Sequence, residues 1–174
     1  MPQLIRVFRA LPKELFRVNN GVAVKLRPSS PQRHSFDIHV SGGLVQAKAL
    51  YPETYKAPNG ASLRPNSPYQ QLLVKKLFKG DDVRIYSIPK GISEKQILRC
   101  RISCQLLLGM PLPESLLLVH ERSDHYSLQP ARNMPLEEAN REITEFLLGN
   151  ALVYTKSQWL HAYPEPTDFD GTPR

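Results

Sequence analysis

Short runs of β-branched, aromatic and aliphatic residues recur along the chain, separated by stretches that contain Gly, Pro, Asn or Ser. Such runs, bounded by turn residues, are typical of short strands. They predict strands over residues 2–11, 22–26, 36–40, 83–88, 116–120 and 125–129. Three other segments have helical patterns, so the order of elements predicts an α+β fold rather than a regular alternation of strands and helices.

The first helix is predicted over residues 68–79, with Ser67 as its N-terminal cap and Gly80 as its stop. The second begins at Pro135, has Glu137 and Glu138 in its first turn, and ends at a Gly149 cap. The side chains expected on their buried faces are Tyr69, Leu72, Leu73 and Leu77, and Leu136, Ala139, Ile143, Phe146 and Leu147. Thr155 is expected to cap a short last helix that carries Trp159.

Length and composition indicate a globular chain. With 174 residues and 41% hydrophobic content, a single domain over residues 1–163 is expected, followed by a loose, Pro-rich tail over residues 164–174. The net charge of +7 points to an acidic partner. The pyrophosphate of a dinucleotide, a nucleic acid and an acidic protein all satisfy that condition.

The pattern shows neither a leader nor a membrane segment. Arg6 and Arg9 interrupt the apolar residues of the N-terminus, and no run reaches the ~18 residues of a membrane span. We therefore expect a soluble protein that works in a cytosol. Cys100 and Cys104 are the two cysteines; without a nearby histidine pair they predict free thiols rather than a disulfide framework or a metal site.

Candidate chemistry is densest at residues 125–135, HYSLQPARNMP. Because side chains alternate along a strand, His125, Ser127 and Gln129 share one face, while Tyr126 and Leu128 share the other. This places an imidazole, a hydroxyl and an amide in one row, as in the wall of a polar cleft. An ordinary solvent-facing strand side explains the same pattern.

Two further segments carry basic and hydroxyl side chains. Arg9 ends an otherwise apolar strand face, where an arginine needs either an anionic partner or a route to water at a frayed edge. In residues 55–67, a turn at Asn59 and Gly60 precedes Ser62 and Arg64. These residues suit the close approach of an anionic ligand, although turn chemistry alone also accounts for them.

Taken in order, these segments resemble the ADP-ribosyltransferase-like toxins, small NAD-associated cytotoxic effectors of bacterial type VI secretion with fungal relatives. Residues 8–10, FRA, are similar to the opening "LYRA" strand of that family. Residues 55–62 resemble its "YAPxxGG(T/A)S" region, and residues 125–134 its "HYTIxPAxxM" segment. Residues 83–91, VRIYSIPKG, match a strand that ends in Ile-Pro-x-Gly. The likeness covers most of residues 4–160.

The resemblance implies split antiparallel sheets flanked by a few helices, and a toxin that acts on NAD in the cytosol of a target cell. It implies cleavage of the bond between nicotinamide and ribose, with or without transfer of ADP-ribose. NAD would be the substrate, no metal would be needed, and an immunity protein is a candidate partner; the macromolecular target stays open. The expected cofactor-binding residues are Arg9, Ser62, Arg64 and Tyr126, and the expected catalytic residues are His125, Ser62 and Gln129.

The chain departs from the family pattern at two places. Many ADP-ribosyltransferases use a glutamate against the ribose, but residues 125–129 contain none, and Glu121 lies on the preceding segment. Either His125 or Gln129 takes that role, or the protein binds NAD without efficient transfer. We expect His125 first, since imidazole can hydrogen-bond a ribose hydroxyl. The second departure is residues 93–110, which interrupt the family spacing. A genuine extra element, a translated intron and an altered gene model all fit this insertion.

Two alternatives to a transferase-like toxin remain. One is a basic module that binds nucleic acid without catalysis, with Phe8-Arg9 and Arg84-Ile85-Tyr86 as its interleaved aromatic and basic residues. The other is a degenerate fold that serves as an interaction protein. NAD binding separates the toxin from the first alternative, and NAD turnover separates it from the second.

Overall fold

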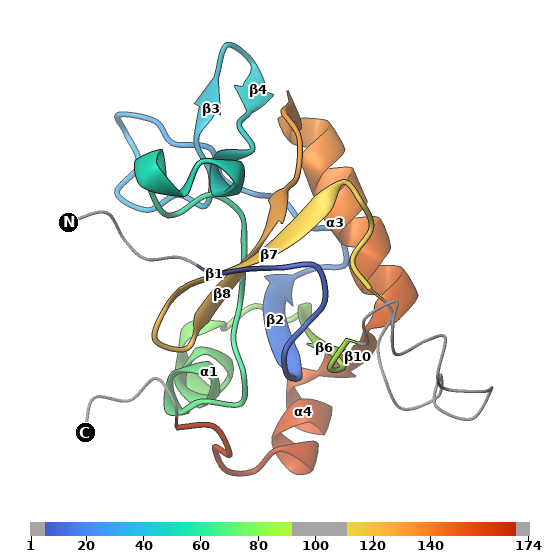
Figure 1. Cartoon of the computed structure of the whole chain (residues 1–174). Coiled ribbons are helices and arrows are strands. Elements are labelled where there is room, and N and C mark those ends of the chain that lie inside the picture. Colours follow the sequence, from blue (N-terminus) through green and yellow to red (C-terminus); the bar gives the residue numbers. More distant parts are fainter. Residues whose placement is uncertain (1–5, 92–110, 170–174) are drawn as a thin grey trace, which may run out of the picture.

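The computed structural model describes residues 6–91 and 111–169 (Figure 1). Within these residues the protein is mixed α+β, with three antiparallel sheets and the helices α1, α3 and α4. The α+β class expected from the order of elements is thereby confirmed. None of the helices in the described ranges is long and apolar enough to cross a bilayer.

The largest sheet has four strands. Their order across the sheet is β1 (Arg6–Phe8), β7 (Leu116–Arg122), β8 (His125–Pro130) and β5 (Ala61–Leu63). Strands β7 and β8 form a hairpin through Ser123 and Asp124, and a bulge at Glu121 shifts their register next to the turn. Ser62 of β5 pairs with Ser127 of β8, so these two residues share one face of the sheet.

Two three-stranded sheets complete the fold. One has the order β10 (Leu152–Thr155), β6 (Val83–Ile88) and β2 (Leu15–Asn20). The other, at one end of the molecule in Figure 1, has the order β3 (Val40–Ser41), β4 (Leu44–Val45) and β9 (Met134–Pro135). Strand β2 was not among the strands predicted from the sequence.

Strands β2 and β5 bring the two larger sheets together. The backbone N–H groups of Phe16 and Arg64 each donate to the carbonyl of the other residue, at 2.6 and 3.0 Å. On its other side, β5 lies so close to β8 that a Cβ on Gly60 would be 2.2 Å from the carbonyl oxygen of Leu128. Glycine is required there because any side chain would collide with this backbone. This approach fixes Ser62 beside the polar face of β8.

The helices follow the expected capping chemistry in part. Helix α1 (Pro68–Leu72) begins at a Ser67 cap and continues as a π-helical segment, η3 (Leu73–Leu77). Helix α3 (Leu136–Asn150) carries Glu137 and Glu138 in its first turn. Helix α4 (Lys156–Ala162) has a complete capping box at Thr155, as predicted. Short 3₁₀ turns occupy Lys48–Leu50 and Pro52–Thr54.

The main core lies between α3 and the two larger sheets, and both faces of β8 are buried. Tyr126 and Leu128 face this core, together with the predicted α3 residues Ala139, Ile143, Phe146 and Leu147. The opposite face of the β7–β8 hairpin packs under Tyr55 and Ala49. The polar row of β8 is therefore not a solvent-facing strand side. A second core contains Phe16, Val18 and Trp159.

Two of the predicted strands are not regular strands. Residues 22–26 form no sheet, because the backbone N–H groups of Val24 and Leu26 donate to side chains of α3, Thr144 Oγ1 and Asn140 Oδ1, both at 2.9 Å. Residues 36–40 provide only a single bridge at Ile38 and the first residue of β3. Side chains of a helix thus replace the expected ladder partners. Of the strand predicted over residues 2–11, the described residues contain the short β1, Arg6–Phe8.

Two details of the predicted helices were wrong. Helix α3 runs past Gly149 to Asn150 and is capped at Ala151, so Gly149 is not the cap. The helical region after Ser67 ends at Leu77. Three residues of its apolar stripe, Tyr69, Leu72 and Leu77, are 46%, 38% and 54% exposed, and the fourth, Leu73, packs against the second core. The buried residues of this region are Gln70, Gln71 and Val74.

The predicted domain limits stay predictions. Cys100, Cys104 and the whole proposed insertion over residues 93–110 lie outside the described residues, as does the end of the chain after residue 169. The described start of the predicted tail makes several contacts. The backbone N–H groups of Thr167 and Asp168 donate to the carbonyl of Asn66, at 2.9 and 3.0 Å, and Lys13 pairs with Asp168 at 2.6 Å.

Candidate functional site

A cavity of about 600 Å³ lies where β2 and β5 bring the two sheets together. Its walls come from β2, β5, the irregular chain after β2, and α1 with the π-helical segment. Basic and apolar side chains dominate the lining: Arg17, Lys25, Arg27 and Arg64, and Phe16, Tyr69, Leu73 and Phe78. Asp37 is its one carboxylate among the described residues. Two residues of the predicted helix stripe, Tyr69 and Leu73, line this cavity.

Arg17 of β2 is the cation best placed to bind an anion in the cavity. Its guanidinium donates to the carbonyl of Ser62 at 3.1 Å, while its Nε is buried and has no hydrogen-bond partner among the described residues. Burial lowers the pKa of Arg17, the charge of Asp37 opposes that shift, and Arg27 adds to it. An arginine keeps its proton in any case. A buried donor without a partner carries a desolvation cost that an anionic ligand would relieve.

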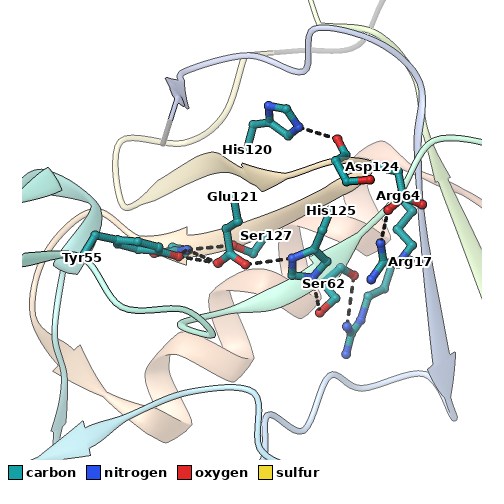
Figure 2. A network of polar contacts seen from close by, with 11 residues as sticks. Arg17, Tyr55, Ser62, Arg64, His120, Glu121, Asp124, His125 and Ser127 are labelled. Carbon is teal, nitrogen blue, oxygen red and sulfur yellow. Dashed lines mark hydrogen bonds and ion pairs between the residues drawn. The ribbon is translucent and has the colours of Figure 1, made fainter. Parts of the chain in front are cut away.

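Arg64 lines the same cavity, but a carboxylate already holds it. Its guanidinium is paired with Asp124 in the β7–β8 turn (Figure 2). The guanidinium also lies 4.5 Å from the ring centroid of Tyr69. Asp124 also accepts a hydrogen bond from Ser67, the cap of α1. Burial lowers the pKa of Arg64 and Asp124 opposes the shift. Arg64 therefore fixes the wall of the cavity and has less capacity for a ligand than Arg17.

Asp37 faces Arg17 across the cavity and pairs with Arg27, at 2.9 Å from the Arg27 Nε. Burial raises the pKa of Asp37, but the hydrogen bonds from Arg27 and the charges of Arg27 and Arg17 outweigh burial and hold the pKa below its usual value. The cavity therefore keeps one carboxylate against four basic side chains, and its potential is positive.

Ser62 connects this cavity to the polar face of β8. Its Oγ lies 3.0 Å from Nε2 of His125, and Nδ1 of His125 lies 2.8 Å from Oε2 of Glu121 (Figure 2). Ser62 itself lines the cavity, whereas His125 is only 9% exposed. The pairing of two predicted site residues, Ser62 and His125, is thereby found in the structure. Glu121 is the third member of the row, and the sequence did not single it out.

The other predicted site residues lie elsewhere. Gln129 is fully buried behind Glu121, with its Nε2 2.6 Å from the Tyr55 hydroxyl and 2.7 Å from Ser127 Oγ, and it does not line the cavity. Tyr126 lies on the opposite face of β8, where it stacks on His120 at 4.4 Å between ring centroids. It belongs to the main core. The alternation along β8 separates it from His125.

Arg9 does not converge with Ser62 and His125. It follows the end of β1, is exposed, and donates to the backbone carbonyl of Glu114 at 3.3 Å. Neither Arg9 nor Phe8 lines the cavity. The aromatic–arginine pair that does so is Phe16–Arg17 on β2. The signal that could have found it is a repeat of the same pair, eight residues further on, flanked by the apolar residues Leu15 and Val18.

The described residues contain no group of three or more His, Cys, Asp or Glu side chains arranged to hold a metal ion. The fold and the site define a mixed α+β protein with a basic, partly aromatic cavity between two sheets and a Ser–His pair at its edge. A model of the Tse2 ADP-ribosyltransferase toxin family matches residues 13–159. The chain therefore belongs to this family, a family of toxins with ADP-ribosyltransferase-like activity.

The matched range begins after Phe8-Arg9-Ala10, so the resemblance of these residues to the opening strand of the family lies outside the match and stays a prediction. No curated protein and no solved structure matched the chain.

Proposed function

We propose that the chain is a toxin that binds NAD in the cavity between β2 and β5 and cleaves the bond between nicotinamide and ribose in the cytosol of a target cell. The observation that carries this proposal is the presence of Arg17 and Ser62 in one cavity, with His125 in contact with Ser62. Membership of the toxin family supports NAD as the substrate. The macromolecule that would accept ADP-ribose stays open.

Three features of the cavity suit the three kinds of group in a dinucleotide, which are the phosphates, the flat rings and the riboses. Arg17 offers an unpartnered buried donor, and guanidinium groups bind phosphate oxygens through strong, charge-assisted hydrogen bonds. Tyr69, Leu73 and Phe78 offer an apolar wall against which a flat ring can pack. Ser62 lines the same cavity and offers a small hydroxyl, suited to a ribose. The proposed phosphate contact is therefore Arg17, in the place first given to Arg9.

The chemistry requires careful placement of the substrate and a group that accepts one proton. Loss of nicotinamide leaves a ribose with oxocarbenium character, which a water or an acceptor nucleophile attacks while releasing a proton. His125 and Ser62 are the groups beside that position, and an imidazole can accept the released proton. Gln129, behind the network, contributes to its geometry and not to contact with the substrate.

The structure offers less for a nucleic-acid module. Tyr86, one of its proposed stacking residues, is fully buried and donates its hydroxyl to the carbonyl of Val22 at 2.6 Å. Phe8 is half-buried against the main core and packs near Tyr126. Bases stack on exposed aromatic faces, which these two residues do not provide.

Release of nicotinamide from NAD tests the proposal. Purified protein is incubated with NAD, with and without a lysate of the intended target cell as a source of acceptors, and nicotinamide is quantified by chromatography. We expect release by the wild type, and a loss of about 100-fold or more in His125→Ala. His161→Ala serves as the control, because His161 lies on α4, outside the cavity lining. Absence of release under both conditions would refute the proposed activity.

A further inference from the structure

Glu121 is a buried carboxylate that lies beside His125 and does not line the cavity. It is 3% exposed, on the face of β7 that also carries Leu117 and Val119. Burying a carboxylate is costly unless its oxygens accept hydrogen bonds. Burial raises the pKa of Glu121, but hydrogen bonds from His125 and Tyr55 outweigh burial and leave the pKa below its usual value. The group is therefore ionised at neutral pH.

The two oxygens of this carboxylate have different surroundings. Oε1 accepts hydrogen bonds from the Tyr55 hydroxyl, from Ser127 Oγ at 2.9 Å and from Gln129 Nε2 at 3.2 Å. Oε2 faces Nδ1 of His125 at 2.8 Å. Figure 2 shows Tyr55 on one side of the carboxylate and His125 on the other. Three donors thus fix the orientation of Glu121, and its second oxygen is directed at the imidazole.

This arrangement decides which ring nitrogen of a neutral His125 carries the proton. Nδ1 is buried, and the Glu121 carboxylate is the acceptor beside it among the described residues. A carboxylate only accepts, so the proton must sit on Nδ1. Nε2 is then an acceptor, and the hydrogen bond to Ser62 at 3.0 Å must be donated by the Ser62 hydroxyl.

We propose that Glu121 is a positioning residue, which holds His125 in the Nδ1-protonated form and thereby turns the Ser62 hydroxyl proton away from the cavity. The Ser62 oxygen then presents lone pairs to the cavity, where it can accept a hydrogen bond from a hydroxyl of the substrate. That last step rests on the proposed function, in which the hydroxyl belongs to the nicotinamide-side ribose of NAD. The proton arrangement of the free protein does not rest on it.

Glu121→Gln should reverse the proton arrangement of His125 and Ser62, while the side chain at position 121 keeps its size. The donors from Tyr55, Ser127 and Gln129 require an acceptor at the Oε1 position, so the amide oxygen of the new side chain is held there. Its NH₂ group must then face Nδ1 of His125, which can only accept. The proton moves to Nε2, which donates to Ser62, and the Ser62 hydroxyl proton turns toward the cavity.

Nitrogen NMR of the free protein, labelled with ¹⁵N-histidine and measured at about pH 8, tests the proton arrangement directly. The five histidines are assigned with a His125→Ala variant. We expect wild-type His125 to be protonated at Nδ1 and bare at Nε2, and Glu121→Gln to show the reverse. Glu14→Gln is the matched control, since Glu14 accepts from the hydroxyls of Ser87 and Tyr163 at 2.6 and 2.9 Å in another part of the fold.

Each outcome decides the proposal. A wild-type His125 that is protonated at Nε2, alone or together with Nδ1, overturns it. An unchanged tautomer in a folded Glu121→Gln protein overturns it as well. If Glu121→Gln does not fold, the wild-type spectrum alone still confirms or refutes the assigned proton.

Kinetics then test what the arrangement does. For release of nicotinamide we expect Glu121→Gln to lower kcat by about 100-fold, with KM within a few-fold of wild type, because a wrong tautomer removes acid–base assistance and not binding. Glu14→Gln should retain wild-type kcat. A normal kcat in Glu121→Gln with a reversed tautomer would overturn the positioning role. Failure of the wild type to release nicotinamide would instead count against the proposed function and leave the NMR result standing.

Discussion

Strands β1 and β2 carry the same local pattern, an aromatic residue followed by arginine, in opposite environments. At the end of β1, Phe8 is half-buried and Arg9 is exposed, bound only to the carbonyl of Glu114 among the contacts described above. On β2, Phe16 is 1% exposed and Arg17 has a buried Nε inside the cavity. The difference lies in the surroundings of the two guanidinium groups: a buried aromatic neighbour and a second sheet hold that of Arg17 away from water, whereas that of Arg9 is exposed.

The packing of the two aromatic residues explains the difference between the strands. Phe16 contacts the rings of Trp159 and Tyr163 edge-on, with centroids 5.4 and 4.9 Å away. Phe8 has one aromatic neighbour of this kind within the described residues, Tyr126 at 6.5 Å. The anchoring of β2 by helix α4 therefore holds Arg17 in place, and within residues 6–91 and 111–169 no comparable aromatic cluster anchors β1.

Removing each aromatic ring should give the largest difference between the two strands. We expect Phe16→Ala to lower the free energy of unfolding by about 3–5 kcal/mol, because it leaves a cavity in a buried aromatic cluster. Phe8→Ala should cost roughly 1–2 kcal/mol, since that ring is only half-buried. Urea unfolding followed by Trp159 fluorescence measures both, and equal losses would contradict the proposed anchoring.

Replacing each arginine by lysine separates the effect of the charge from that of the planar guanidinium, because the charge stays and the planar group is lost. Arg17→Lys should weaken NAD binding by roughly 10-fold, since a lysine cannot offer the paired donors of a guanidinium. Arg9→Lys should leave the affinity within twofold. Fluorescence titration with NAD gives both values. An Arg17→Lys protein with wild-type affinity would show that only the charge of β2 matters.

The sequence predicted those parts of the fold that depend on local chemistry. The cap at Thr155, the buried face of α3 and the strands β6 and β8 follow from capping residues and from side-chain periodicity. The strand expected at residues 22–26 failed because its N–H groups pair with α3 side chains distant in sequence. Periodicity describes which residues are buried and carries no information about which partner covers them.

The candidate site also contains residues that the sequence predicted and residues that depend on tertiary contacts. His125 and Ser62 were found because each lies in a short motif of unusual composition. Glu121 was set aside as part of the preceding segment, although a two-residue turn at Ser123 and Asp124 between two strands would have placed it near His125. Arg17 and Arg9 cannot be told apart by their neighbours in sequence. Only the meeting of β2 with β5 distinguishes them.

Acid unfolding should give the smallest difference between the two arginines. The pKa of Asp37 is lowered in the folded state, so Asp37 stabilises the fold above its unfolded pKa of about 3.9, and this contribution is lost as the pH falls through the lower folded value. Arg17→Ala removes part of the cause, so its loss of stability below about pH 4 should be shallower than that of wild type. Arg9→Ala should follow the wild-type profile. Thermal unfolding across this pH range measures the slopes; parallel profiles for wild type and Arg17→Ala would contradict the interaction.

Calorimetric titration of NAD into wild type, Arg17→Ala and Arg9→Ala most directly tests the central claim, that the cavity between β2 and β5 is the NAD site. Loss of charge-assisted hydrogen bonds to a phosphate should weaken binding by about 10- to 100-fold in Arg17→Ala. Arg9→Ala should bind within twofold of wild type, and circular dichroism should show that both variants are folded. A large loss in Arg9→Ala, with wild-type binding by Arg17→Ala, would contradict the account and place the NAD site beside β1.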